Sequence, residues 1–189
     1  SMVPGPGIPS QPELGGMFAN WLYPRVVNQR NPKDLDSAWG YVPPPLVGEG
    51  NKVQPGWLYD FLREPYVIRP AVVLRMPKFN LSPQEVEALV NYFAAKDNAT
   101  YPYEYYDRRN PLELSAKELA YADRLSDALK IVTNRNYCVA CHSVGDFTPE
   151  GGVDALAPNL DQVHNRLRPD YLHKWIANPK HILPYTAMF

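Results

Sequence analysis

Asn136-Tyr137-Cys138-Val139-Ala140-Cys141-His142 places two cysteines and a histidine within five consecutive residues. On a helical turn, positions i, i+3 and i+4 share one face, so both thiols and the imidazole can meet one flat ligand together. Cys-x-x-Cys-His is the attachment signature of a c-type haem. Cys138 and Cys141 would bond the two vinyl groups of the porphyrin, and His142 would ligate the iron.

Other roles for the two cysteines stay open. They are the only cysteines in the chain, so a four-cysteine zinc site is excluded, but two cysteines with two of the four histidines are an alternative zinc set. A thioredoxin-like dithiol would need a strand followed by a helix, which the residues around Cys138 do not predict. A structural disulfide between Cys138 and Cys141 is a further alternative.

The composition indicates many loops and short helices. The chain has 189 residues, and 21 of them are proline, well above the average of roughly 5%. This length allows one ordinary domain or two small ones. The 19 basic and 20 acidic residues nearly cancel, so neither nucleic acid nor an anionic membrane is an expected partner. No apolar run approaches the roughly 20 residues of a membrane span.

An internal repeat favours two domains. Residues 44–70 and 158–184 align without a gap at an offset of 114 residues, which predicts a duplicated unit. The identical positions are Pro44/Pro158, Leu46/Leu160, Asn51/Asn165, Pro55/Pro169, Leu58/Leu172, Pro65/Pro179, Ile68/Ile182 and Pro70/Pro184. A deletion of two residues then aligns Met188 with Met76.

The two copies differ in their ligating residues. Both cysteines and all four histidines lie in the second half of the chain. The first copy therefore cannot hold a haem in the way that the second can, and we expect it to be an empty structural relative.

Proline and capping signals predict where several helices begin. Helices are predicted over residues 55–62 and 169–176, each opening on a proline. Capping boxes at residues 82–85 and 115–118 predict two more, and the second of these is expected to run on to Val132.

Two further segments carry weaker signals. Residues 17–28 are apolar enough for a short buried helix, which Pro24 is expected to end or kink. Residues 31–40 are expected to form a polar loop, and residues 65–77 an extended loop that carries Met76.

Residues 115–189 resemble a class I cytochrome c domain. The resemblance rests on the amphipathic helix before Cys138, the Cys-x-x-Cys-His motif, the loop led by Pro158, the short helix that begins Pro-Asp-Tyr-Leu at residues 169–172, and the loop methionine Met188.

The resemblance implies a role for each matching residue. Cys138 and Cys141 would carry the thioethers of one covalent haem c, and His142 would be the proximal ligand. The carbonyl of Pro158 would accept the ring N–H of His142, a contact that tunes the iron, and Met188 would be the distal ligand. The apolar residues expected to bury the haem are Leu160, Leu172, Trp175 and Ile176.

Residues 41–97 look like the methionine-loop and closing-helix half of the same fold. The expected fold class is therefore all-α, with two small cytochrome c-like helical domains in tandem, rich in loops and proline, of which only the second has the haem motif. The expected organisation is a flexible tail (1–16), a haemless domain (17–99), a linker (100–114) and a haem c domain (115–189).

Such arrays are similar to those in large multidomain bacterial c-type cytochromes outside the cytoplasm. We therefore expect a periplasmic or otherwise extracytoplasmic location, with an export signal upstream of this chain and membrane association only through other parts of the parent protein. The second domain is expected to be truncated before the C-terminal helix of the family.

The distal ligand has alternatives because Met188 lies one residue from the chain end. Any of His164, His173 and His181 would serve, although each is more often a surface residue. A domain-exchanged oligomer in which Met76 and the helix after Ser82 complete the pocket is another alternative. As an ordinary side chain, Met76 would be a core filler.

The expected function is one-electron transfer with redox partner proteins or neighbouring domains, by a carrier rather than an enzyme. Methionine ligation would raise the potential relative to bis-histidine ligation. One rival is a haem enzyme, or a gas or peroxide sensor, with an open distal site. A second rival is an interaction module in which the haemless domain docks partners.

Overall fold

The computed structural model describes residues 16–30, 37–100, 110–152 and 156–188. It is mostly helical, at 57%, and contains no strands within these ranges. The predicted all-α class is therefore confirmed. Residues 1–15 of the predicted tail and 101–109 of the predicted linker lie outside the described ranges.

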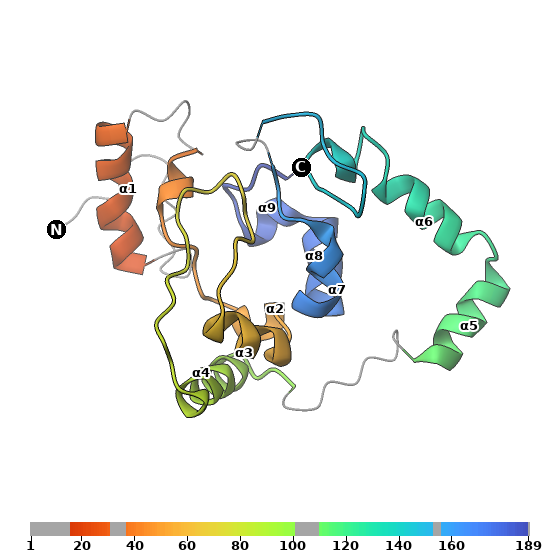
Figure 1. Cartoon of the computed structure of the whole chain (residues 1–189), viewed down its shortest axis with the longest axis horizontal. Coiled ribbons are helices and arrows are strands. Elements are labelled where there is room, and N and C mark those ends of the chain that lie inside the picture. Colours follow the sequence, from red (N-terminus) through yellow and green to blue (C-terminus); the bar gives the residue numbers. More distant parts are fainter. Residues whose placement is uncertain (1–15, 31–36, 101–109, 153–155, 189) are drawn as a thin grey trace.

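Short helices make up the molecule (Figure 1). In chain order they are α1 (Gly16–Arg30), η2 (Ser37–Tyr41), α2 (Glu49–Lys52), α3 (Pro55–Arg63), α4 (Pro83–Lys96), α5 (Pro111–Ala120), α6 (Arg124–Val132), η4 (Cys138–Ala140), η6 (Leu160–Gln162), α7 (Val163–Arg166), α8 (Pro169–Ala177) and α9 (Pro179–Ile182). No helix in the described ranges is both long and apolar enough to cross a membrane.

The first core cluster lies between α1 and η2. Ala19, Tyr23 and Val26 recur at helical spacing along α1 and are buried against η2. Helix α1 runs on through Pro24. Of the two expected effects of this proline, ending the helix is therefore wrong, and a kink stays a prediction. The expected polar loop at residues 31–40 is also wrong in its described part, because η2 begins at Ser37 and buries Trp39.

The second core cluster joins α3 and α4, and residues of the second repeat copy pack into it. Its buried members are Val53, Leu58, Leu62, Val86, Val90 and Leu167. Both helices begin where proline and capping signals predict. Ser82 caps α4 with a complete capping box, in which its side chain accepts from the Glu85 N–H and the Glu85 side chain accepts from the Ser82 N–H.

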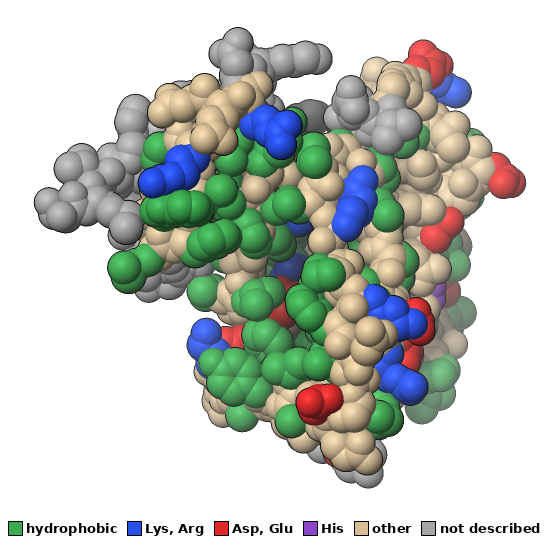
Figure 2. Space-filling view, turned by 60° about the vertical axis from the view of Figure 1, so that its left-hand side comes forward, with side chains coloured by type: hydrophobic (Ala, Val, Ile, Leu, Met, Phe, Trp, Pro, Cys, Tyr) green, Lys and Arg blue, Asp and Glu red, His purple; other side chains and the backbone are tan. Residues whose placement is uncertain are grey.

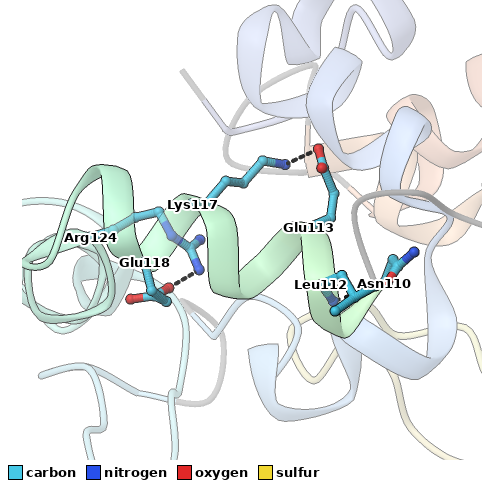
Figure 3. A network of polar contacts seen from close by, with 6 residues as sticks. All are labelled: Asn110, Leu112, Glu113, Lys117, Glu118 and Arg124. Atoms are coloured by element: carbon cyan, nitrogen blue, oxygen red, sulfur yellow. Dashed lines mark hydrogen bonds and ion pairs between the residues drawn. The ribbon is translucent and has the colours of Figure 1, made fainter.

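The helix predicted to begin at Ser115 begins earlier and is interrupted. Asn110 caps α5 by accepting from the Leu112 N–H at 3.0 Å, and Pro111 takes the first helical position. The chain leaves the helix at Tyr121, and α6 follows as a separate helix. An ion pair between Glu118 and Arg124 joins the two helices (Figure 3). The prediction that Ser115 starts a helix through a capping box is therefore wrong, because Asn110-Pro111 provides a competing start about one turn upstream.

The repeat has a structural counterpart. Helices α2 and α7 have the same bounds at the offset of 114 residues, and so do α3 and α8. The residues before α3 and α8 also match, since Gln54 has φ −77° and ψ 137° and Arg168 has φ −70° and ψ 139°. Each copy therefore folds its matching residues in the same way.

The two copies pair with each other through equivalent backbone positions. The Gln54 N–H donates to the Arg166 carbonyl at 2.9 Å, and the Arg168 N–H donates to the Lys52 carbonyl at 2.9 Å. Because Gln54 matches Arg168 and Lys52 matches Arg166, these two hydrogen bonds are the same contact seen from each copy. A local two-fold pseudo-symmetry relates the copies.

The side chains follow the same symmetry. Val53 and Leu167, which match each other, form an antiparallel bridge at the centre. The Gln54 Nε2 donates to the Leu167 carbonyl at 2.7 Å, and the Arg168 Nε donates to the Val53 carbonyl at 3.0 Å. This reciprocal pairing holds the second copy against the first.

One close approach is not symmetric. Gly50 lies against α4, where a Cβ would come within 2.2 Å of the Phe93 carbonyl oxygen. The matching residue in the second copy is His164, which is exposed. A helix therefore cannot pack on α7 as closely as α4 packs on α2.

Hydrophobic side chains also reach the surface of the first half. The side of the molecule that carries α1 in Figure 1 is turned forward in Figure 2, and hydrophobic side chains cover much of it.

Ser82→Ala is expected to lower the free energy of unfolding by about 1 kcal/mol, because the Glu85 N–H loses its acceptor and α4 packs in the second core. Chemical denaturation followed by circular dichroism measures the change. Ser115→Ala is the matched control, since Ser115 lies exposed inside α5 and alanine favours a helix interior. Equal losses in the two variants would contradict the assigned cap.

Candidate functional site

The Cys138–His142 segment forms one tight turn. Within and after η4, the Cys141 N–H donates to the Cys138 carbonyl at 3.2 Å and the His142 N–H donates to the same carbonyl at 2.8 Å. Val139 is buried and anchors the turn, while Cys138 is half-buried and Cys141 is exposed. Both thiols are free, and the turn packs against α6.

A second segment runs beside this turn and fixes it. The Ala157 N–H donates to the Cys141 carbonyl and the Leu160 N–H donates to the Ser143 carbonyl, both at 2.9 Å. Further along, the Gly145 N–H donates to Asp161 Oδ1 at 2.7 Å. Gly145 has φ +56°, a left-handed conformation that glycine adopts without strain.

This pairing sets the orientation of the His142 ring. Its Nδ1 lies 2.6 Å from the Pro158 carbonyl oxygen. A carbonyl oxygen can only accept, so Nδ1 carries the proton and Nε2 presents its lone pair. This is the contact that the cytochrome c resemblance implies for Pro158, and it is the usual way in which proteins orient a metal-binding histidine.

The donor set fits a covalently attached haem. Two free thiols lie three residues apart on one turn, and the His142 imidazole beside them has its Nδ1 bonded to Pro158, which leaves Nε2 as the nitrogen that could ligate iron. In the part of the chain that the structure describes, no three His, Cys, Asp or Glu side chains come together as a metal-binding group.

The residues expected to bury a haem lie on or near α8. Leu160, Leu172 and Trp175 are half-buried, and Ile176 is 61% exposed. Leu172 packs against the second core cluster. Ile176 and the apolar side chains of α6 have no covering group in the described structure; those of α6 are Leu125, Leu129 and Ile131.

The two candidate methionines differ in their surroundings. Met188 is half-buried, and its Sδ accepts from Trp175 Nε1 at 3.0 Å. Its N–H donates to Thr186 Oγ1 at 3.3 Å. Met76 is 40% exposed on the loop between α3 and α4, so the expectation that it fills the core is wrong. Arg75, Pro77 and Lys78 flank it, and on the same loop it is Leu81 that packs against the second core cluster.

The three later histidines lie on the surface, as expected of ordinary side chains. His164, His173 and His181 are exposed. The His164 Nδ1 lies 3.0 Å from the Asp161 carbonyl oxygen, which turns this ring toward its own loop.

Several half-buried ionisable groups lie around the contact between the copies. Burial lowers the pKa of the Arg166 guanidinium, which lies over the Trp57 ring at 6.0 Å, and it also lowers the pKa of Arg69. Burial raises the pKa of Tyr171 to about 12, and the carboxylate of Glu49 adds to this shift. Burial raises the pKa of Tyr185 as well. Tyr171 is therefore neutral at neutral pH.

Asp161 is a positioning residue that the sequence analysis missed. The Asn159 side chain accepts from the Asp161 N–H at 2.9 Å and starts the turn that aims Asp161 at Gly145. Asparagine commonly bonds the backbone two residues ahead of it, so Pro-Asn-Leu-Asp at residues 158–161 carried the signal.

Comparisons of this chain with protein-family models, with curated proteins and with solved structures find no match.

Asp161→Ala is expected to cost about 1 kcal/mol of stability and to loosen the His142 ring, because the Gly145 N–H loses its acceptor. Long-range ¹H–¹⁵N correlation spectra of the haem-free chain should then show more of the Nε2–H tautomer. Asp146→Ala, at an exposed position of the same loop, is the control. If both variants keep the wild-type tautomer, Asp161 does not position the ring.

Proposed function

We propose that this chain is a one-electron carrier with a single haem c attached at Cys138 and Cys141 and ligated by His142. The observation that carries the proposal is the 2.6 Å contact between His142 Nδ1 and the Pro158 carbonyl. It fixes the tautomer that an iron ligand needs, within four residues of two free thiols.

Each residue of the turn has a defined task. The Cys138 and Cys141 thiols would add across the two vinyl groups, sulfur to one carbon and hydrogen to the other, so that no atom would be lost and no oxidant consumed. His142 would hold the iron through its Nε2 lone pair, and the Pro158 carbonyl would make the ring a stronger donor by accepting from Nδ1–H. When bound, the haem supplies an iron that cycles between the ferric and ferrous states.

The surrounding apolar residues support the same proposal. Apolar side chains are exposed on α6, which contacts the turn, and Ile176 is exposed on α8. Covering them with a porphyrin would remove this surface from water, a favourable step of about 25 cal/mol per Å². A buried haem also has a reduction potential set by its surroundings.

We further infer that the two repeat copies are tandem cytochrome c-like domains of a larger extracytoplasmic redox protein. The matching bounds of α2 with α7 and of α3 with α8 support a common fold for the copies. The redox partners are neighbouring domains or separate proteins. The first copy has no histidine or cysteine and carries no haem.

One observation favours a second candidate function. The Met188 sulfur accepts a hydrogen bond from Trp175, and a methionine held there permanently would leave the distal side of an iron open. The chain would then bind a diatomic gas or peroxide. Rapid carbon monoxide binding to the reduced protein favours this candidate, whereas a low-spin, unreactive iron favours the electron carrier.

Expression in a host that matures c-type cytochromes is expected to give one covalent haem per chain, counted from the reduced absorption spectrum in pyridine. The double variant Cys138→Ala, Cys141→Ala should lose the covalent haem. His173→Ala should keep it, because His173 lies on the surface of α8. Colourless wild-type protein, or haem that acid and acetone extract, would refute the proposal.

Met188→Ala is expected to abolish the near-infrared charge-transfer band between methionine sulfur and ferric iron. The matched variant Met76→Ala should leave the band intact, since Met76 lies on an exposed loop of the other copy. Loss of the band in Met76→Ala instead would support the domain-exchanged arrangement. A band that survives Met188→Ala excludes this residue as the ligand.

A further inference from the structure

A residue of the second half of the chain packs against the first core cluster. Tyr185 lies on the segment 183–188, which we call the ligand loop, and it stacks on Trp39 with ring centroids 4.2 Å apart and an interplanar angle of 6°. Trp39 in turn lies against Tyr23, with centroids 4.7 Å apart. The ligand loop is thereby attached to α1 and η2 of the haemless half.

The receiving surface is well packed. Trp39 is 6% exposed, and the side chains of Tyr23 and Ala38 around it are buried. Close packing of this kind fixes the Trp39 ring in one position. Stacked aromatic rings add stabilisation beyond the area that they bury, so Tyr185 is held firmly from one side.

The ligand loop has contacts both within itself and to α8 and α9. Within it, the Thr186 N–H donates to the Leu183 carbonyl at 3.0 Å, and the Met188 N–H donates to Thr186 Oγ1 at 3.3 Å. From outside it, Trp175 Nε1 donates to the Met188 sulfur at 3.0 Å, and the Leu183 N–H donates to the Pro179 carbonyl at 2.9 Å. Three residues reach at most about 10 Å when fully extended, so fixing the Tyr185 ring confines the region that the Met188 sulfur can occupy.

The elements that precede the repeat can be compared between the two halves of the chain. In the second half, α6 leads to the turn η4, then to Pro158, η6, α7 and α8. In the first half, α1 leads to the turn η2, then to Pro44, α2 and α3. A helix and a short turn therefore precede the repeat in each half, although Trp39 does not align with Cys138–His142 at the offset of 114 residues. In one half this leading turn carries the cofactor motif, and in the other it carries the ring on which Tyr185 stacks.

We propose that Trp39 of the haemless half is a positioning residue for Met188, because its stack on Tyr185 clamps the ligand loop. The haemless copy thus has a task in the redox site of its partner copy. This proposal rests on the proposed function, in which Met188 is the distal ligand.

The test uses the haem-loaded full chain and imidazole as a competing ligand. Imidazole displaces a methionine ligand, and the loss of the near-infrared band measures its apparent affinity. Trp39→Leu should raise this affinity about tenfold, which corresponds to 1.4 kcal/mol, because a free ligand loop competes less well for the iron. Trp39→Phe should restore most of the wild-type affinity, since a ring can still stack.

Two further variants separate positioning from general destabilisation. Trp21→Leu changes a tryptophan at a more exposed position on α1, stacked on Phe18 with centroids 6.1 Å apart, and should leave imidazole affinity unchanged. Tyr185→Leu removes the stack from the other side and should match Trp39→Leu. The double variant should exceed neither single variant, because both remove one interaction.

A readout without haem accompanies these measurements. In the haem-free chain, hydrogen exchange at the Thr186 amide should be faster in Trp39→Leu and Tyr185→Leu than in Trp21→Leu. If Trp39→Leu does not fold, Tyr185→Leu decides the question.

The failures can be told apart. Wild-type protein without covalent haem refutes the proposed function. Wild-type protein with haem but without the methionine band overturns the clamp and leaves haem attachment standing. Covalent haem with an intact band, and imidazole affinities within twofold of wild type in both Trp39→Leu and Tyr185→Leu, overturns the clamp alone.

Discussion

The reciprocal pairing of residues 52–54 with residues 166–168 is the constraint on which the rest of the structure depends. Its backbone donors and acceptors are satisfied only when the two copies face each other, and a buried polar group left without a partner costs about 1–3 kcal/mol. Arg168 is 6% exposed and donates from Nε to the Val53 carbonyl, so this buried charged side chain has a partner across the contact between the copies. The contact lies at matching positions of the two copies, although every cysteine and histidine lies in the second half of the chain.

The pairing also explains how the second copy is held. Leu167 is a buried member of the cluster formed with α3 and α4, and Val163, Tyr171 and Leu172 pack against it. Neither α5 nor α6 has a buried side chain of its own. The second half is therefore supported from the first, and its own apolar side chains remain available to a large ligand such as the haem of the proposed function.

Much of the fold could be predicted because the deciding signals are local. Proline at the first helical position and a capping side chain act within one turn, so the starts of α3, α4 and α8 follow from a few residues each. The prediction of where α5 begins was wrong for a related reason. Asn110-Pro111 and Ser115-Glu118 are both local start signals, and local rules do not say which of the two is used. Burial of Trp39 could not be predicted, because its partner Tyr185 is distant in the chain and belongs to the other copy.

In the candidate site, too, the features set by local sequence could be predicted and those set by distant contacts could not. The His142 ring is oriented by Pro158, 16 residues away. The loop between them has recognisable turn residues, so sequence motifs could identify both His142 and Pro158. The position of Met188 depends on a loop whose Tyr185 packs against Trp39 of the first half. No sequence motif predicts a contact between such distant residues. Under the proposed function, the axial methionine influences the potential while the cysteines and histidine secure attachment. Substitutions in the haemless half can then change the potential without touching the attachment motif, which gives selection a reason to keep a copy that has no haem.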